Sequence, residues 1–266
     1  MNTITYSPKN KRGRLLVNLL IIYFYVFGAF AMSYILTNHN LKTSLFYCSV
    51  ILFAVLFASF AELSQSNKLL YGFFMFLSFF TLFFVYGFRD FSGIDDPVYL
   101  RIFEQIAHNG MLDYFKYSTM EPGYLILNKV VSIFTDNYLY MQLISSFLPL
   151  FLFYYGFNKY KRIISLPTAV FLLCTMIFFQ MLAAGLVRMF IALGIVFLAF
   201  RFIPQQQPKR YVFYILLATL FHYSSFFLIF LVYFAINKNN LSKRIKQFYT
   251  IIFVSSPILF IFISRF

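Results

Sequence analysis

The stretch RDFSGIDDPVY, residues 89–99, opens a polar segment that continues to about residue 136 in a chain that is otherwise mostly apolar. The sequence holds eight acidic residues in all, and this segment contains most of them: Asp90, Asp95, Asp96, Glu104, Asp113, Glu121 and Asp136. A chain that gathers its carboxylates in one loop is expected to bind or react near that loop. The remaining apolar runs then predict a scaffold that positions the loop.

The composition indicates a membrane protein. Hydrophobic residues make up 61% of the chain and charged residues only 11%, whereas soluble domains carry about 25% charged residues. The net charge of +14 comes from Lys and Arg in short loops between apolar runs. That placement is the topology signal of a membrane protein and argues against nucleic acid as a partner.

The apolar runs predict an all-α, polytopic transmembrane bundle of about eight spans, since one span needs about 20 apolar residues. The runs are residues 15–37, 41–61, 69–88, 138–158, 163–184, 186–203, 211–236 and 247–264. We expect one integral membrane domain over residues 1–266, with spans 1–3 in 14–88, an outer loop at 89–137 and the remaining spans in 138–266. The first run has no cleavage site and predicts a retained span rather than a signal peptide.

The basic residues predict a cytoplasmic amino terminus, because Lys9, Lys11, Arg12 and Arg14 precede the first run. The pattern then places the 89–137 loop outside. The charge pattern conflicts with a single crossing of run 211–236, because that crossing would place the cations that follow the run outside. A bend back near His222 to Ser225 would return them to the cytoplasm and is favoured; a single tilted span is the alternative.

The outer loop is expected to contain two helices. The first has an apolar face of Tyr99, Ile102, Phe103 and Ile106, with Asp95 or Asp96 as a cap and Pro97 in its first turn. The second begins at Pro122, and the residues that share its face are Tyr124, Leu127, Val131 and Phe134. That face suits a helix on the outer leaflet.

Arg89 is the first candidate for a binding role. It ends the third run, and Arg binds phosphate oxygens in a bidentate manner while keeping its charge at any working pH. Gly93 allows a turn that brings backbone amides close to a ligand. The alternative is an interfacial Arg89 that pairs with Asp90 or Asp95 and only anchors a helix end.

Arg188 is the sharper candidate, because it lies inside an apolar run with Ala184 and Ala192 on the same helical face. A charge within the membrane is a functional hypothesis by default. Its rival is an Arg that extends its charge to the interface.

His222 is a candidate general base in the middle of run 211–236. The alternative is a hydrogen-bonded packing residue. The carboxylates of Asp95 and Glu121 are further candidates for acid–base work, although Glu121 before Pro122 also reads as a helix cap. No spacing of His, Cys, Asp or Glu is typical of a metal site, so no metal and no cofactor are expected.

Four motifs follow one another in the chain: Arg89-x3-Gly93-x-Asp95-x3-Tyr99; Glu121-Pro122-Gly123-Tyr124; Val187-Arg188 with Ala192; and Phe221-His222 with Ser224. Together they resemble the EpsG family of bacterial polytopic proteins, which includes Wzy-like polymerases of exopolysaccharide and O-antigen. The resemblance covers roughly residues 70–235. It departs from the family at Met189, where the family often has Gln.

The resemblance implies an enzyme of the bacterial cytoplasmic (inner) membrane. Its expected reaction is glycosyl transfer that joins polyprenyl-diphosphate-linked oligosaccharide repeat units at the outer face. The site residues carried over are Asp95, Glu121 and His222 for catalysis, and Arg89, Arg188, Gly93 and Tyr99 for the diphosphate. Expected partners are the lipid-linked oligosaccharide, membrane lipid and other polysaccharide-assembly proteins.

Three other functions are considered from the sequence. One is a ligase or acyltransferase of the same pathway, although no His-Asp or Ser-His nucleophile arrangement supports acyl transfer. A transporter or flippase of the same lipid-linked sugar needs the cationic cavity but no acid–base residue. A non-catalytic subunit of a polysaccharide synthase complex needs neither.

Overall fold

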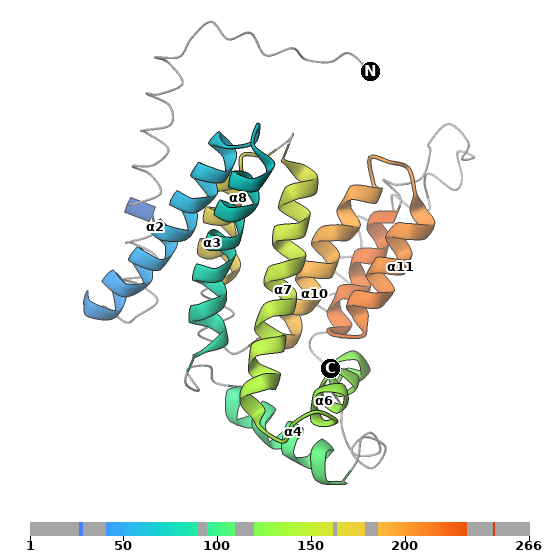
Figure 1. Cartoon of the computed structure of the whole chain (residues 1–266). Helices are drawn as coiled ribbons and strands as arrows, with labels where there is room; N and C mark the ends of the chain where they lie inside the picture. The colour runs from blue at the N-terminus through green and yellow to red at the C-terminus, as the bar shows by residue number, and fades with distance from the viewer. Residues whose placement is uncertain are drawn as a thin grey trace, which may run out of the picture. The chain divides into compact units, whose positions relative to one another are not determined.

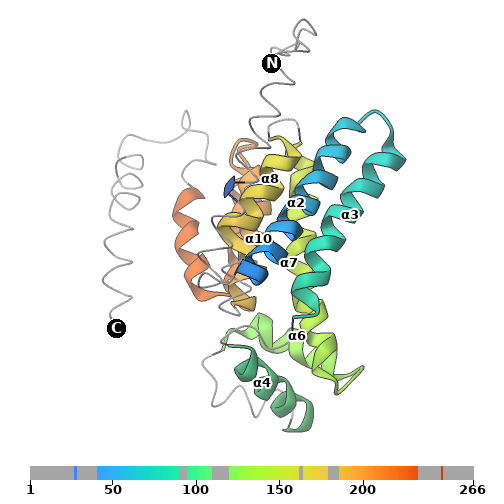
Figure 2. The same cartoon turned by 90° about the vertical axis from the view of Figure 1, so that its left-hand side faces the viewer.

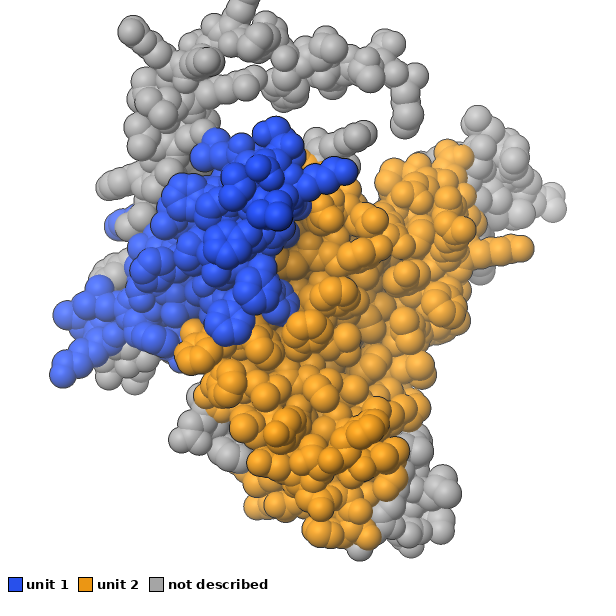
Figure 3. All heavy atoms as spheres, viewed as in Figure 1, with its two compact units in different colours: residues 1–82, 165–179 blue, residues 83–164, 180–266 orange. Residues whose placement is uncertain are grey.

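The computed structural model describes residues 27–28, 41–89, 95–109, 120–161, 164–178, 186–232 and Gln247. Every regular element within these ranges is a helix, in agreement with the predicted all-α class (Figure 1). The chain forms two compact units, one of residues 1–82 with 165–179 and one of 83–164 with 180–266 (Figure 3). Each unit is described by itself.

Among the helices that the structure describes, three are long and apolar enough to cross a membrane. They are α2, Leu41–Leu63, with its apolar part at Leu45–Leu63; α3, Lys68–Gly87; and α7, Tyr138–Tyr160. They correspond to three of the predicted spans. Runs 15–37 and 247–264 lie almost wholly outside the described residues, so the count of eight spans stays a prediction.

Two further predicted spans form shorter helices. Run 163–184 gives α8, Leu166–Leu172, which continues as a π-helix, η1, at Leu173–Phe178. Run 186–203 gives α10, Val187–Ala199, followed by a 3₁₀ turn, η2, at Phe200–Phe202. An α-helix of 13 residues is about 20 Å long, which is shorter than the roughly 30 Å hydrocarbon core of a bilayer.

Unit 1 is built on α2, the larger part of α3, and α8. The Ser78 hydroxyl on α3 donates to the Ala54 carbonyl on α2 at 2.7 Å, and α8 packs against α2. Glu62, the one acidic residue outside the polar segment, accepts from the Leu166 amide at 2.6 Å and the Ser165 hydroxyl at 3.0 Å. Its carboxylate therefore satisfies donors at the start of α8.

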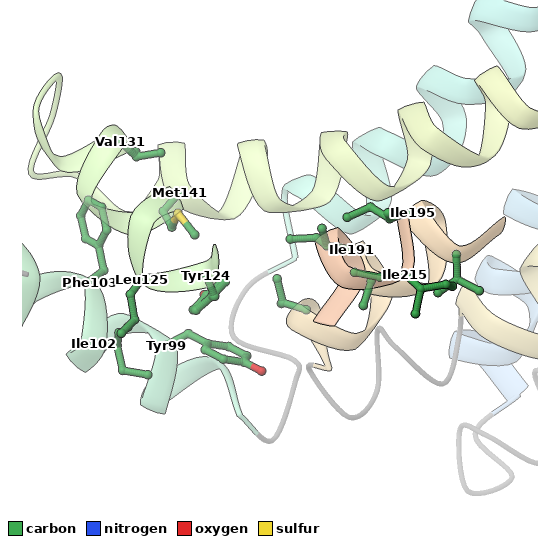
Figure 4. Close-up of a cluster of buried hydrophobic side chains, with 14 of the residues drawn as sticks. Tyr99, Ile102, Phe103, Tyr124, Leu125, Val131, Met141, Ile191, Ile195 and Ile215 are labelled. Carbon is green, nitrogen blue, oxygen red and sulfur yellow. The ribbon is translucent and has the colours of Figure 1, made fainter. Parts of the chain in front are cut away.

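Unit 2 contains the two helices of the polar loop, α4 (Asp96–Asn109) and α6 (Pro122–Ser132). The predicted face of α4 is confirmed, since all four of its members are buried: Tyr99, Ile102, Phe103 and Ile106. They pack with residues of α6 and α7 in the core that Figure 4 shows. In Figures 1 and 2, α4 and α6 lie beside the amino-terminal end of α7, which begins at Tyr138.

α6 begins at Pro122 as predicted, and Tyr124 and Val131 are buried. Phe134 was wrongly assigned to the same face, because the helix ends at Ser132 and the Phe134 side chain is 83% exposed. The outward side of α6 is itself apolar, with Ile126, Val130 and Ile133 exposed. The face that was expected to meet the outer leaflet instead packs into the protein core through Tyr124, Leu127 and Val131. Contact of the opposite side of α6 with the membrane stays a prediction.

The bend expected near His222 is present. α11 covers Pro208–Thr219, and a 3₁₀ helix, η3, follows at Tyr223–Leu231. The chain doubles back between them, since the Tyr211 hydroxyl donates to the Leu228 carbonyl at 2.7 Å. Each arm is about 18 Å long, roughly half of a span. α10 packs between α7 and α11. The bend lies beside the start of α10 and beside the polar segment, because His222 and Arg188 both contact Glu121.

Candidate functional site

The site is built around the Glu121 side chain. Glu121 is the N-cap residue of α6, with extended backbone, but its side chain makes no capping bond to the helix. Its carboxylate instead accepts from Nη1 of Arg188 through one oxygen and lies 3.2 Å from Nδ1 of His222 through the other. Glu121 therefore stands at the cap position that its place before Pro122 predicts, but its side chain does not cap the helix. Its carboxylate bridges a guanidinium and an imidazole.

Gly123 allows the first turn of α6, which follows Glu121, to lie close to the α11–η3 bend. Its amide donates to the Leu220 carbonyl at 2.7 Å, and a Cβ at this position would lie 2.7 Å from the same oxygen. Only a residue without a side chain allows the first turn of α6 to approach so closely. Because His222 follows Leu220 by two residues, this contact places the imidazole beside Glu121. The glycine of the Glu121-Pro122-Gly123 motif thus has a steric role that its sequence context alone did not show.

Arg188 enters the site from the start of α10. In addition to Glu121, its Nε donates to the Tyr99 hydroxyl at 3.4 Å. The Tyr99 ring packs edge-on against Tyr124, with ring centroids 5.2 Å apart. Tyr99 is therefore fixed by α6 while its hydroxyl faces Arg188. Four elements converge here: α4, α6, α10 and the α11–η3 bend.

The exposure of the three charged side chains is uneven. The Glu121 side chain is 4% exposed, whereas Arg188 is 22% and His222 30% exposed. Burial favours the neutral form of Glu121, but the hydrogen bonds from His222 and Arg188 and the charge of Arg188 hold its pKa below the ordinary value. The site thus presents an accessible cation and an accessible imidazole, joined by a buried carboxylate that is ionised at neutral pH.

A second cluster surrounds Arg89 and is closed. Its guanidinium makes two hydrogen bonds to Asp96, at 2.7 and 3.1 Å. Its Nη1 donates to the Tyr86 carbonyl at 2.9 Å and the Ser146 hydroxyl at 3.2 Å. Gln142 donates to the Arg89 carbonyl. The Arg89 and Asp96 side chains are each 2% exposed.

The predicted site residues therefore divide. Tyr99, Glu121, Arg188 and His222 come together, and they originate from four separate motifs. Arg89 lies in the neighbouring closed cluster, which α4 connects to the first through Asp96 and Tyr99, one helical turn apart.

Asp95 acts on Tyr99 through its charge, but within the described residues its carboxylate makes no hydrogen bond or ion pair to either cluster. The Asp95 carbonyl accepts from the Val98 and Tyr99 amides and begins α4. Gly93 and Asp90 lie outside the described residues. Of the partners expected for Arg89, Asp95 is replaced by Asp96, because the first turn of α4 directs the carboxylate of Asp96 toward the end of α3.

Sequence reasoning missed Asp96, Gln142 and Ser146 as partners of Arg89. A signal was available for the last two, since both are polar residues four positions apart in an otherwise apolar helix, α7. Such spacing puts both on one helical face. Within the described residues, no three His, Cys, Asp or Glu side chains gather as metal ligands.

The apolar helices define a membrane protein, and unit 2 carries an accessible polar site beside the start of α10. Residues 72–266 match the model of the EpsG family, and the chain belongs to that family, the exopolysaccharide, Wzy-like polymerase type. No curated protein and no solved structure matches the chain. Membership suggests a membrane protein that resembles polysaccharide polymerases.

Proposed function

We propose that this protein is a glycosyltransferase that joins polyprenyl-diphosphate-linked oligosaccharide repeat units at the outer face of the cytoplasmic membrane. The observation that carries the proposal is the bridge from Arg188 through Glu121 to His222. Arg188 can bind an anionic leaving group, and His222 can accept the proton of an attacking hydroxyl. Family membership supports the same substrate class.

Arg188 is assigned to the diphosphate of the donor. Its side chain is accessible, and guanidinium groups bind phosphate oxygens through charge-assisted hydrogen bonds. In the structure the Glu121 carboxylate accepts a hydrogen bond from the Arg188 guanidinium. An arriving diphosphate therefore displaces this carboxylate. Arg188 then stabilises the negative charge that develops on the diphosphate as the glycosidic bond breaks.

His222 is assigned as the general base, with Glu121 as its partner. When the Nδ1–H group donates a hydrogen bond to the Glu121 carboxylate and keeps its proton, the lone pair of Nε2 is free to accept the proton of the acceptor hydroxyl. The acceptor oxygen bonds to the anomeric carbon, the bond from that carbon to the diphosphate breaks, and polyprenyl diphosphate leaves. Glu121, released from Arg188, stabilises the imidazolium that forms.

Tyr99 is assigned to orient Arg188, through its hydroxyl and its packed ring. The earlier assignment of Arg89 to the diphosphate stays a prediction from the family. Our proposal does not rest on it, because Asp96, Ser146 and the Tyr86 carbonyl already satisfy the enclosed guanidinium. Asp95 likewise stays a prediction as a catalytic carboxylate.

The length profile of the surface glycan tests this proposal. A deletion strain complemented with Arg188→Ala is expected to carry single repeat units in place of long polymer. Arg101→Ala, which removes an exposed cation from α4, is the matched control and is expected to give normal lengths. Complete loss of glycan in the Arg188 variant would indicate a transporter, and normal polymer would overturn the assignment, provided that both variants reach wild-type amounts in the membrane.

A further inference from the structure

The end of unit 2 that lies farthest from Glu121 carries a second group of cations. α7 begins at Tyr138 beside the polar-loop helices and ends at Tyr160, and its 23 residues extend over about 34 Å. Lys159 lies in the last turn of this helix, and Arg201 lies in the 3₁₀ turn that follows α10. A membrane that α7 crosses therefore has the Glu121 site at one face and these two cations at the other.

Both cations converge on one phenol. The Lys159 ammonium lies 5.0 Å from the centre of the Tyr155 ring, and the charges of Arg201 and Lys159 both act on the Tyr155 hydroxyl. The guanidinium carbon of Arg201 lies 4.5 Å from the ring of Phe202 and 5.9 Å from that of Tyr214. Aromatic faces thus hold the two cations in place.

The close contact of α7 with α10 fixes this arrangement. A Cβ on Gly156 would lie 2.6 Å from an atom of the Phe197 ring, so the glycine allows the helices to touch. The Tyr160 hydroxyl donates to the Phe197 carbonyl at 3.2 Å. The ends of the two helices are therefore joined beside Lys159 and Arg201.

No carboxylate of the described residues forms an ion pair with Lys159 or Arg201. The sequence contains no acidic residue beyond Asp136. Nε of Arg201 is buried and has no hydrogen-bond partner within the described part of the chain. Two like charges that share one neutral hydroxyl repel each other, and a bound anion would relieve this repulsion.

We infer that Arg201, Lys159 and Tyr155 form a binding site for the phosphate of an anionic phospholipid headgroup. The position at the end of membrane helices is the depth of a headgroup, and basic pockets between such helices bind anionic lipids. Apolar side chains that neighbour the cluster along the chain are exposed: Phe151, Phe200 and Phe213. These apolar surfaces can contact the acyl chains of a lipid, whereas free phosphate would make no contact with them. The inference is independent of the reaction assigned to the Glu121 site.

Native mass spectrometry of the purified full chain tests the site, with phosphatidylglycerol or phosphatidylcholine titrated into the same detergent. The wild type is expected to retain phosphatidylglycerol preferentially. Arg201→Gln and Lys159→Gln are each expected to weaken that retention about tenfold, the usual effect of losing one charge-assisted hydrogen bond. Arg210→Gln is the matched control. It removes the same charge from an exposed residue whose guanidinium donates to Gln207, and it is expected to behave as the wild type.

Unchanged phosphatidylglycerol retention in both the Arg201 and the Lys159 variant would overturn the inference. Inorganic phosphate is titrated separately. Phosphate binding that depends on Arg201, without any preference for phosphatidylglycerol over phosphatidylcholine, would overturn the lipid as the ligand. Lys159 is exposed at a helix end, so Lys159→Gln keeps the test decisive if Arg201→Gln does not fold.

Discussion

Two arginines in unit 2 each meet a carboxylate from the polar segment, and the two pairs differ in access. Arg89 and Asp96 are each 2% exposed and form a two-bond fork that backbone and side-chain groups complete. Arg188 is 22% exposed and shares Glu121 with an imidazole. A closed pair keeps its geometry because breaking it leaves a charge without solvent or partner. Water reaches the open pair, so we propose that the Arg89 pair is structural and that the Arg188 pair exchanges its carboxylate for a ligand.

The largest effect is expected from Asp96→Ala, which leaves the Arg89 guanidinium buried and unpaired. Removing one partner of a buried ion pair costs about 3–5 kcal/mol, so the variant is expected to lose much of its folded population. Thermal unfolding of the purified protein measures this loss. Glu121→Gln is the comparison for the open pair and is expected to unfold close to the wild type, since Arg188 is reached by water. Equal destabilisation of the two variants would remove the distinction between the pairs.

A smaller effect on stability is expected from Gly123→Ala. The added methyl group meets the Leu220 carbonyl, and overpacking of this kind costs about 1–3 kcal/mol. Because the displacement separates Glu121 from His222, polymer length is expected to fall more than stability does. Gly72→Ala is the control, since a Cβ at Gly72 has no atom within 4 Å. Normal polymer from Gly123→Ala would show that this close approach does not position the site.

The smallest effect is a pH dependence from Glu121. Its pKa is lowered in the folded protein, so its contribution to stability is complete above the ordinary carboxyl pKa of about 4.3. The contribution is lost as the pH falls through the lowered value. The stability difference between wild type and Glu121→Gln is therefore expected to shrink as the pH falls below about 4.3 and through the lowered value. A difference that does not shrink in this acidic range would contradict the ionic bridge.

The sequence predicted those features that depend on periodicity and charge. The face of α4 followed from apolar residues at helical spacing, and the start of α6 followed from Pro122. The bend at His222 followed from cations that a single crossing would have left on the wrong side. These signals depend on the spacing of residues and on the order of charges along the chain, so a single sequence contains them.

The partners across the fold were beyond such signals. Asp95 and Asp96 are equivalent in sequence, and only the direction of the first turn of α4 selects Asp96 for Arg89. The contact of Gly123 with Leu220 joins residues that are far apart in the chain. The four motifs were expected to form one site, but whether an arginine is enclosed or open depends on packing that residue spacing does not give.

The central claim is that Glu121 holds the place of a diphosphate on Arg188. Binding of a polyprenyl diphosphate to the purified full chain tests it most directly, with the wild type, Arg188→Gln and Glu121→Gln compared in one detergent. Arg188→Gln is expected to weaken binding at least about tenfold, whereas Glu121→Gln is expected to bind more tightly than the wild type because the competing carboxylate is gone. Unchanged affinity in Arg188→Gln, or weaker binding in Glu121→Gln, would contradict the account.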